Sequence, residues 1–168
     1  LLKAQKGQFT GCLAPFGYRK DPEDKNHLLI DEETAPIVRR LFAWALEGHG
    51  PNYIRRRLEE EKIPCPTYWN RVRGLRNVST KWEKKDPVNG RYIWDFTVIK
   101  DILMNPVYTG AIASQKKEYR FKIGTIGEKK PEEWIVVENQ HEPLVDRKTF
   151  DIVQRKLKSR QRPRQTGE

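Results

Sequence analysis

Apolar residues recur at three- and four-residue spacing from Ile37 to Leu46, and this pattern constrains the fold more than any other feature of the chain. The spacing places the apolar side chains on one stripe of an α-helix. The acidic run 31–33 suits the N-terminus of such a helix, where carboxylates cap free N–H groups and interact favourably with the helix dipole. Gly48 ends the helix. The chain must therefore supply other elements against which this stripe packs.

Three further helices are predicted from the same kind of spacing. The second begins at Gly50-Pro51-Asn52 and ends before Pro64, because the two prolines at 64 and 66 cannot continue a helix. The third spans about Asp95 to Met104 and is closed by Asn105-Pro106. A last helix begins near Asp146 and frays from Ser159 onwards. The residues expected to face the core from the third helix are Phe96, Ile99, Ile102 and Leu103.

Strands are predicted on both sides of these helices. Two β-prone runs, 16–20 and 27–30, flank a turn-rich segment and indicate a hairpin. Later strands are expected at 107–113, 119–123 and 134–138, with turns at 124–127 and 129–131. The expected fold class is α+β, with helix-turn-helix-like helices packed with a small antiparallel β-sheet. The length of 168 residues favours one domain over 13–158, between a linker at 1–12 and a basic tail at 159–168.

The charge balance points to a polyanionic partner. The chain contains 33 Lys and Arg against 23 Asp and Glu, a net charge of +10. Nucleic acid is the first partner to consider and an anionic membrane surface the second. No apolar run approaches the roughly 20 residues that span a bilayer. The two cysteines and three histidines are too scattered for a zinc site, and no cofactor is predicted.

A long loop over 67–93 is the strongest candidate for contact with nucleic acid. Its cations are interleaved with aromatic residues, and cations suit a phosphate backbone while aromatic rings hold the loop on the core or stack on bases. A solvated loop, diluted by Glu83 and Asp86, is the competing interpretation. The cations proposed to contact DNA are Arg71, Arg73, Arg76, Lys81, Lys84, Lys85 and Arg91.

The predicted third helix is the second candidate. If its apolar face packs inward, Thr97, Lys100, Asp101 and Met104 point outward, and Thr97 and Lys100 could contact base edges and phosphates in a major groove. A core helix with a solvated polar face has the same spacing.

Two other basic runs are interpreted differently. Arg55 to Arg57 precede Glu59 to Glu61 at helical spacing, which favours salt bridges over contact with DNA. The C-terminal run from Arg155 to Arg164 suits either a helix C-terminus or a linker that follows DNA.

Residues for catalysis are not apparent. The serines at 79, 114 and 159 lack an activating base or an arginine-rich pocket in the sequence around them. No metal-binding spacing and no glycine-rich phosphate loop occurs.

Several segments together resemble the recombinase domain of large serine site-specific recombinases. They follow one another in the same order as in that family and extend over nearly the whole chain. The segment 98–110 is the most specific of them. The matching segments are Ala14–Tyr18, Ile37–Phe42, Ile54–Leu58 with Ile63-Pro64, Val98–Gly110, and His141–Asp146 followed by Thr149-Phe150 and Val153-Gln154.

The resemblance implies a role that the residues alone do not define. In that family a catalytic domain with a serine nucleophile precedes the recombinase domain, and a zinc-ribbon domain follows it. The chain would then bind double-stranded DNA at half of an attachment site in the cytoplasm, and would be inactive alone. The linker with Lys3 and Lys6 would follow the minor groove, and the third helix would enter the major groove. The intact protein would be a dimer or tetramer on DNA, with a monomer open for this segment alone.

Two residues depart from the family pattern. Arg55 stands where the family usually has a small residue, and Lys62 where a turn glycine is common. Both bear on how closely the second helix packs. A basic protein-interaction module within a larger recombination complex is the alternative function, and a free-standing nuclease or RNA-binding enzyme is disfavoured by the missing catalytic residues.

Overall fold

The computed structural model describes residues 5–75, 86–114, 116–120 and 125–160. The chain divides into two compact units, one formed by Leu1–Arg39 with Asn105–Phe150 and the other by Arg40–Met104 with Asp151–Glu168. Helices and short antiparallel strand pairs make up the described residues, so the predicted α+β class is confirmed.

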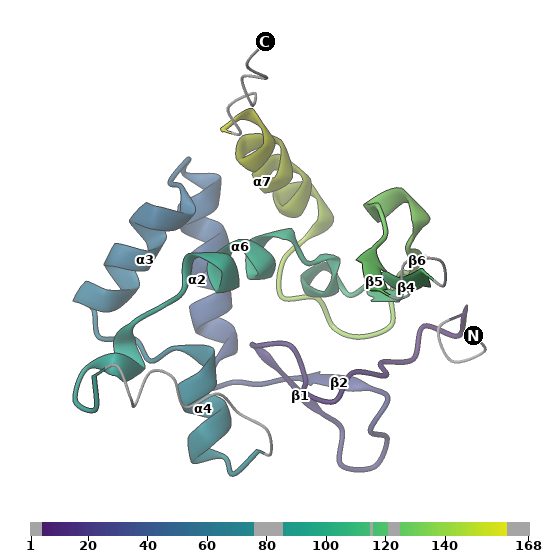
Figure 1. Cartoon of the computed structure of the whole chain (residues 1–168), viewed down its shortest axis with the longest axis horizontal. Helices are drawn as coiled ribbons and strands as arrows, with labels where there is room; N and C mark the ends of the chain where they lie inside the picture. Colours follow the sequence, from purple (N-terminus) through teal and green to yellow (C-terminus); the bar gives the residue numbers. More distant parts are fainter. Residues whose placement is uncertain (1–4, 76–85, 115, 121–124, 161–168) are drawn as a thin grey trace. The chain divides into compact units, whose positions relative to one another are not determined.

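The first unit contains the strands. The hairpin predicted near the N-terminus is present, with Tyr18 opposite Ile30 and Arg19 opposite Leu29 (Figure 1). Two further antiparallel pairs, β3 with β6 and β4 with β5, come from the segment after residue 110. The elements are β1 (Tyr18–Lys20), β2 (Leu28–Ile30), the 3-10 helix η2 (Pro106–Thr109), β3 (Ile112–Ser114), β4 (Lys117–Arg120), β5 (Thr125–Glu128), the 3-10 helix η3 (Pro131–Glu133) and β6 (Ile135–Val137).

Two tyrosines and a histidine join the hairpin to the later segments of this unit. Tyr18 and Tyr108 are stacked with ring centroids 5.9 Å apart, and His141 meets the Tyr18 ring edge-on at 4.8 Å. The Tyr18 hydroxyl donates to the Glu142 carbonyl at 2.8 Å and accepts from the Leu144 N–H at 3.2 Å. The Tyr108 hydroxyl donates to the Phe16 carbonyl at 2.8 Å. Burial raises the pKa of both phenols above the ordinary value, so both stay protonated as donors.

His141 makes the stability of this unit depend on pH. Its Nε2 lies 2.7 Å from the Val107 carbonyl, which only accepts, so the hydrogen is on Nε2 and the Nδ1 lone pair is buried without a hydrogen-bond partner. Protonation would add a buried N–H with no acceptor. Burial accordingly lowers the pKa of His141 below its usual value.

We therefore expect the chain to lose stability as the pH falls below about 6.5, the pKa of an unfolded histidine. In that range the unfolded chain binds more protons than the folded one, and the loss is complete below the folded pKa. Above pH 6.5 the contribution is fully present. Urea unfolding at pH 7.5 and pH 5.5 checks this, with His141→Gln as the comparison. An equal loss of stability in the variant would assign the dependence to other groups.

The second unit is helical. Helix α3 packs against α6, and four residues of the two helices are fully buried: Ile54, Leu58, Ile99 and Leu103. Leu41 and Phe42 of α2 are also buried, which confirms the apolar stripe predicted there (Figure 1). The elements are α2 (Ala35–Leu46), which begins in the first unit, α3 (Pro51–Glu60), α4 (Pro66–Val72), the 3-10 helix η1 (Gly90–Tyr92), α6 (Phe96–Met104) and α7 (Arg147–Ser159), which enters this unit at Asp151.

Two hydrogen bonds hold the segment before α6 against the connection between α3 and α4. The Trp94 indole donates to the Ile63 carbonyl at 2.8 Å, and the Cys65 N–H donates to the Arg91 carbonyl at 2.8 Å. Trp94 is 1% exposed. The start of α6 is therefore positioned by contacts with a segment about thirty residues earlier in the chain.

The basic C-terminal run is partly explained by the end of α2. Lys156 Nζ donates to the Leu46 carbonyl at 2.6 Å, and the Arg160 guanidinium donates to the Gly48 carbonyl. Carbonyls at a helix C-terminus have no partner within the helix and carry partial negative charge. The helix-terminus interpretation thus holds for these two cations, although the helix is α2 and not their own. Arg155 and Lys158 are exposed, and Arg162 and Arg164 lie outside the described residues.

Four sequence-based expectations were wrong in detail. Residues 67–93 are not all loop, because α4 and η1 occupy both ends. The strand predicted from Val107 begins only at Ile112, because Asn105 caps a 3-10 turn by accepting from the Val107 N–H. Residues 125–127, predicted as turn, belong to β5. Phe96, expected in the core, is 41% exposed.

Candidate nucleic-acid interface

The positive charge is concentrated in the second unit. Arg40–Met104 and Asp151–Glu168 contain 19 Lys and Arg against 10 Asp and Glu, whereas the first unit contains 14 against 13. Nearly all of the net charge of +10 therefore belongs to the helical unit. A polyanion would be attracted to that unit, so the candidate interface is sought there.

Helix α6 presents a broad polar and apolar face to solvent. Ile99, Ile102 and Leu103 are buried on the opposite side. Thr97 and Asp101 are exposed and Lys100 is half-buried, as predicted from the spacing. The outward face also includes two large apolar side chains, Phe96 at 41% and Met104 at 42% exposure.

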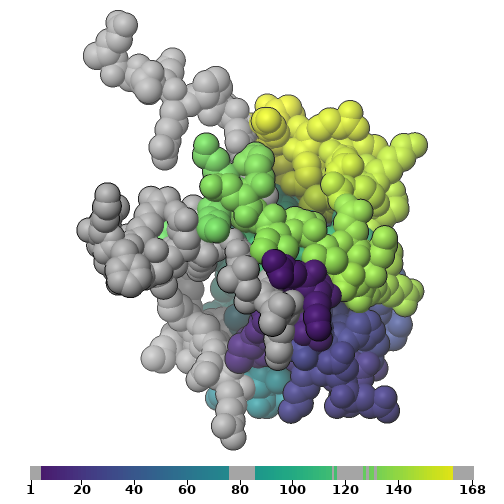
Figure 2. Space-filling view, turned by 90° about the vertical axis from the view of Figure 1, so that its right-hand side faces the viewer, coloured from purple at the N-terminus to yellow at the C-terminus, as the bar shows by residue number. Residues whose placement is uncertain are grey.

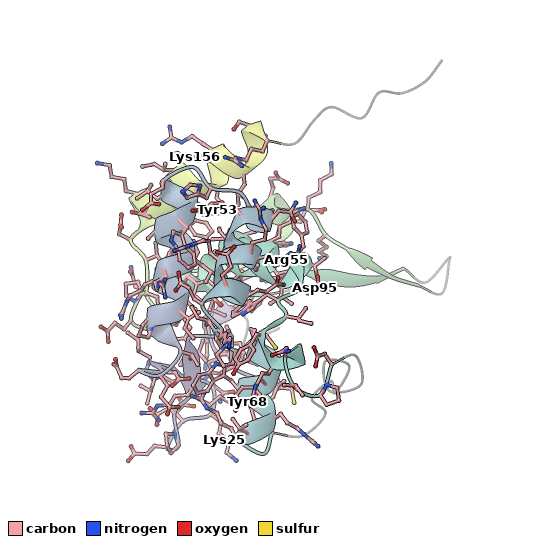
Figure 3. The ribbon with its side chains drawn as sticks, turned by 90° about the vertical axis from the view of Figure 1, so that its left-hand side faces the viewer. Lys25, Tyr53, Arg55, Tyr68, Asp95 and Lys156 are labelled. Atoms are coloured by element: carbon pink, nitrogen blue, oxygen red, sulfur yellow. The ribbon has the colours of Figure 1, made fainter. Side chains whose placement is uncertain are left out.

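The first turn of α6 is held by Asp95. Its carboxylate accepts from the Thr97 N–H at 2.9 Å and from the Thr97 hydroxyl at 2.8 Å. In Figure 3 Asp95 appears between Arg55 and Tyr68. Because the Thr97 hydroxyl already donates to Asp95, it remains only an acceptor toward any further partner. The capping role of Asp95 was missed, although an aspartate two residues before a threonine at a helix start was a usable signal.

Cations and aromatic rings meet where α4 and η1 approach each other. The Arg91 guanidinium lies 5.1 Å from the Tyr92 ring centroid and 5.9 Å from that of Tyr68. The Arg73 guanidinium lies 5.3 Å from the Trp69 ring centroid. The predicted interleaving of cations and aromatics thus produces cation–π contacts on both chain segments that flank residues 76–85. Arg71 is exposed on α4.

The structure brings only part of the predicted site together. Arg71, Arg73, Arg91, Thr97 and Lys100 all belong to the second unit. Lys6 is exposed in the first unit. The remaining predicted contacts, Lys3, Arg76, Lys81, Lys84 and Lys85, lie outside the described residues.

The segment that carries Lys6 lies against the rest of the first unit. The Phe9 N–H donates to the Asn26 carbonyl at 2.8 Å. A Cβ added to Gly7 would come within 2.4 Å of the Gln140 side chain, so the backbone passes directly over that residue. Figure 2 shows this start of the chain, in dark purple, beside the yellow-green residues near 140.

The arginines of α3 are engaged in ion pairs, as predicted. Arg55 Nη1 lies 3.4 Å from Glu59 Oε1, and Arg57 Nη2 lies 2.9 Å from Glu61 Oε1. Arg40 of α2 also contacts Glu61, at 2.5 Å. These pairs are partly exposed and each contributes little stability. They do reduce the number of α3 cations that are available to a ligand.

Lys62, one of the two departures noted in the sequence, has a φ of +52°. That left-handed backbone is the reason a glycine suits this position, and lysine adopts it at some cost. The second departure, Arg55, is accommodated half-buried beside Glu59.

Two searches of the described residues gave no candidate. None of their helices is long and apolar enough to cross a bilayer. Among the same residues, no three His, Cys, Asp or Glu side chains are grouped so that they could hold a metal ion.

Comparison with known proteins gives one family and two solved structures. The sequence model described as Recombinase matches residues 32–160. A structure from work on the sequence requirements of the Listeria innocua prophage attP site is similar with a TM-score of 0.56 and 16% identity, over 94% of this chain and 48% of that one. A crystal structure of an LSR–DNA complex is similar with a TM-score of 0.52 and 17% identity, over 94% of this chain and 36% of that one. The chain thus spans half or less of the length of these structures.

Proposed function

Because this chain belongs to the recombinase family, as the recombinase domain of a large serine recombinase, we propose that it binds double-stranded DNA at half of an attachment site. In this proposal α6 lies in the major groove and the α4–η1 cations contact phosphates. The catalytic serine that cleaves DNA belongs to a part of the parent protein outside these residues. The intact protein acts in the cytoplasm as a dimer or tetramer on DNA.

One observation carries this proposal. The unit with 19 Lys and Arg against 10 Asp and Glu is also the unit in which α6 exposes polar side chains and packs through its other face. Phosphate contacts supply sequence-independent affinity, and side chains on a groove-bound helix supply sequence recognition. Both requirements are met within one unit. The crystal structure of the LSR–DNA complex, with a similar fold, supports DNA as the ligand class.

The first test is selection from randomised duplexes at moderate salt, followed by sequencing of the bound fraction. We expect enrichment of a motif about half an attachment site long. Binding without enrichment would leave a non-specific basic surface and contradict recognition by α6. If the folded chain bound no duplex, the alternative of a protein-interaction module would be favoured.

Lys100→Ala tests the role of α6. We expect the variant to bind the selected duplex about five- to thirtyfold more weakly, which corresponds to about 1–2 kcal/mol for a lost base contact, and to discriminate less at one base pair. Lys148→Ala is the matched control, because it removes an equally exposed charge from the nearly neutral first unit. Binding isotherms at fixed salt measure both. Parent-like affinity for Lys100→Ala would place the DNA face elsewhere.

A further inference from the structure

The outer face of α6 contains more apolar surface than a merely solvated helix face requires. Phe96 is 41% exposed and Met104 42% exposed, and Lys100 lies between them at four-residue spacing. A single exposed apolar side chain is ordinary on a protein surface. Two at opposite ends of one helix face, in the most basic part of the chain, indicate a surface that is covered by a ligand.

The dimensions and charge of this face suit duplex DNA. Phe96 and Met104 are eight residues apart, or about 12 Å along an α-helix, which matches the width of a major groove of about 12 Å. Lys100 supplies a positive charge between them, in a unit with a large excess of cations. The ligand that fits this combination is a groove lined by phosphates whose floor exposes apolar groups.

Only one base presents an apolar group in the major groove. Thymine exposes its C5-methyl group there, whereas the other three bases expose hydrogen-bond donors and acceptors. Along the α6 face Lys100 is a donor, and Thr97 is limited to accepting because its hydroxyl donates to Asp95. Phe96 has neither capacity and contacts a methyl group favourably.

We propose that Phe96 is a specificity-determining residue that contacts the C5-methyl group of a thymine in the bound half-site. The inference rests on the proposed function, since it requires α6 in the major groove. It adds a specific consequence: one position of the site requires thymine for its methyl group and not for its base pairing.

Replacement of thymine by uracil tests this, because it removes the methyl group and leaves the Watson–Crick edge unchanged. Each thymine of the selected duplex is replaced in turn, and binding is measured for the parent chain and for Phe96→Ala. For the parent we expect one position at which uracil weakens binding about fourfold, the ratio expected for one methyl-sized apolar group. For Phe96→Ala we expect weaker binding to the thymine duplex and no further loss with uracil at that position.

Leu46→Ala is the matched control. Leu46 is 37% exposed in the same unit but belongs to α2, so this variant should keep the parent's response to uracil. Phe96→Leu retains an apolar side chain and should keep part of that response. Far-UV circular dichroism of each variant confirms that the fold is intact.

Three results would overturn the inference and leave the proposed function standing. They are a selected motif without thymine, a parent chain indifferent to uracil at every position, and a Phe96→Ala variant with an undiminished uracil effect. If the parent bound no duplex, the proposed function would fail as well.

Discussion

Trp94→Ala is expected to lower the free energy of unfolding by about 3–5 kcal/mol, the range for removing a large buried aromatic side chain. Trp94 is 1% exposed, so truncation leaves a cavity at the start of α6. It also deprives the Ile63 carbonyl of a 2.8 Å hydrogen bond. Since small domains are stable by only about 5–15 kcal/mol, a substantial fraction of the variant should be unfolded at physiological temperature.

The measurement is urea unfolding followed by circular dichroism, because the substitution alters tryptophan fluorescence. Trp94→Phe separates the two causes: it keeps most of the ring volume and removes the hydrogen bond, and we expect a loss of about 1–3 kcal/mol. A change below about 1 kcal/mol for Trp94→Ala would show that the surrounding helices close over the site, and would contradict the role of Trp94 as the main anchor of this segment.

Gly110→Ala should also be strongly destabilising, for a reason that lies in the backbone. Gly110 has a φ of +85°, a conformation that costs about 1–3 kcal/mol for other residues. An added Cβ would lie 2.8 Å from the His141 carbonyl oxygen, which is backbone and cannot rotate away. The Gly110 carbonyl also accepts from the Gln140 N–H at 2.8 Å, so movement of this turn would disturb that hydrogen bond. We expect a loss above the conformational cost alone.

Gly74→Ala provides the comparison. Gly74 has a φ of +69°, and nothing lies within 4 Å of the Cβ position. This variant therefore measures the conformational cost without a clash. Denaturant midpoints of both variants, with unchanged slopes, give the difference. Equal losses would show that the contact with His141 is relieved at no cost, which contradicts the close approach described here.

The elements that the sequence predicted well are those with a buried stripe. Helices α2, α3 and α6 each bury two or more residues at helical spacing, and these residues carry the periodic signal. Helix α4 buries none of its own residues and is only seven residues long. A helix without an apolar stripe has no periodicity to detect, so α4 was assigned to the loop. Strand β5 was missed because its glycine and threonine residues resemble a turn.

The candidate site was predictable in its composition and not in its geometry. The outward direction of Thr97 and Lys100 follows from the burial of Ile99 and Leu103. Phe96 was misplaced because an apolar residue at the first position of a helix fits the inward pattern equally well. The placement of Arg91 near two tyrosine rings depends on the hydrogen bond between Cys65 and Arg91, a contact between distant residues. No local pattern in the sequence encodes such a contact.

The Asp95 cap has a consequence for how the affinity of this chain should respond to salt. Many helices bind a phosphate with the free N–H groups of their first turn. In α6 the Thr97 N–H is already bonded to a carboxylate, whose negative charge also repels phosphate. The first turn of α6 is therefore a poor anion site, and the counterions released on binding should be those displaced by Lys and Arg side chains. The slope of log affinity against log salt, at about 0.9 per phosphate neutralised, becomes a direct count of those side chains.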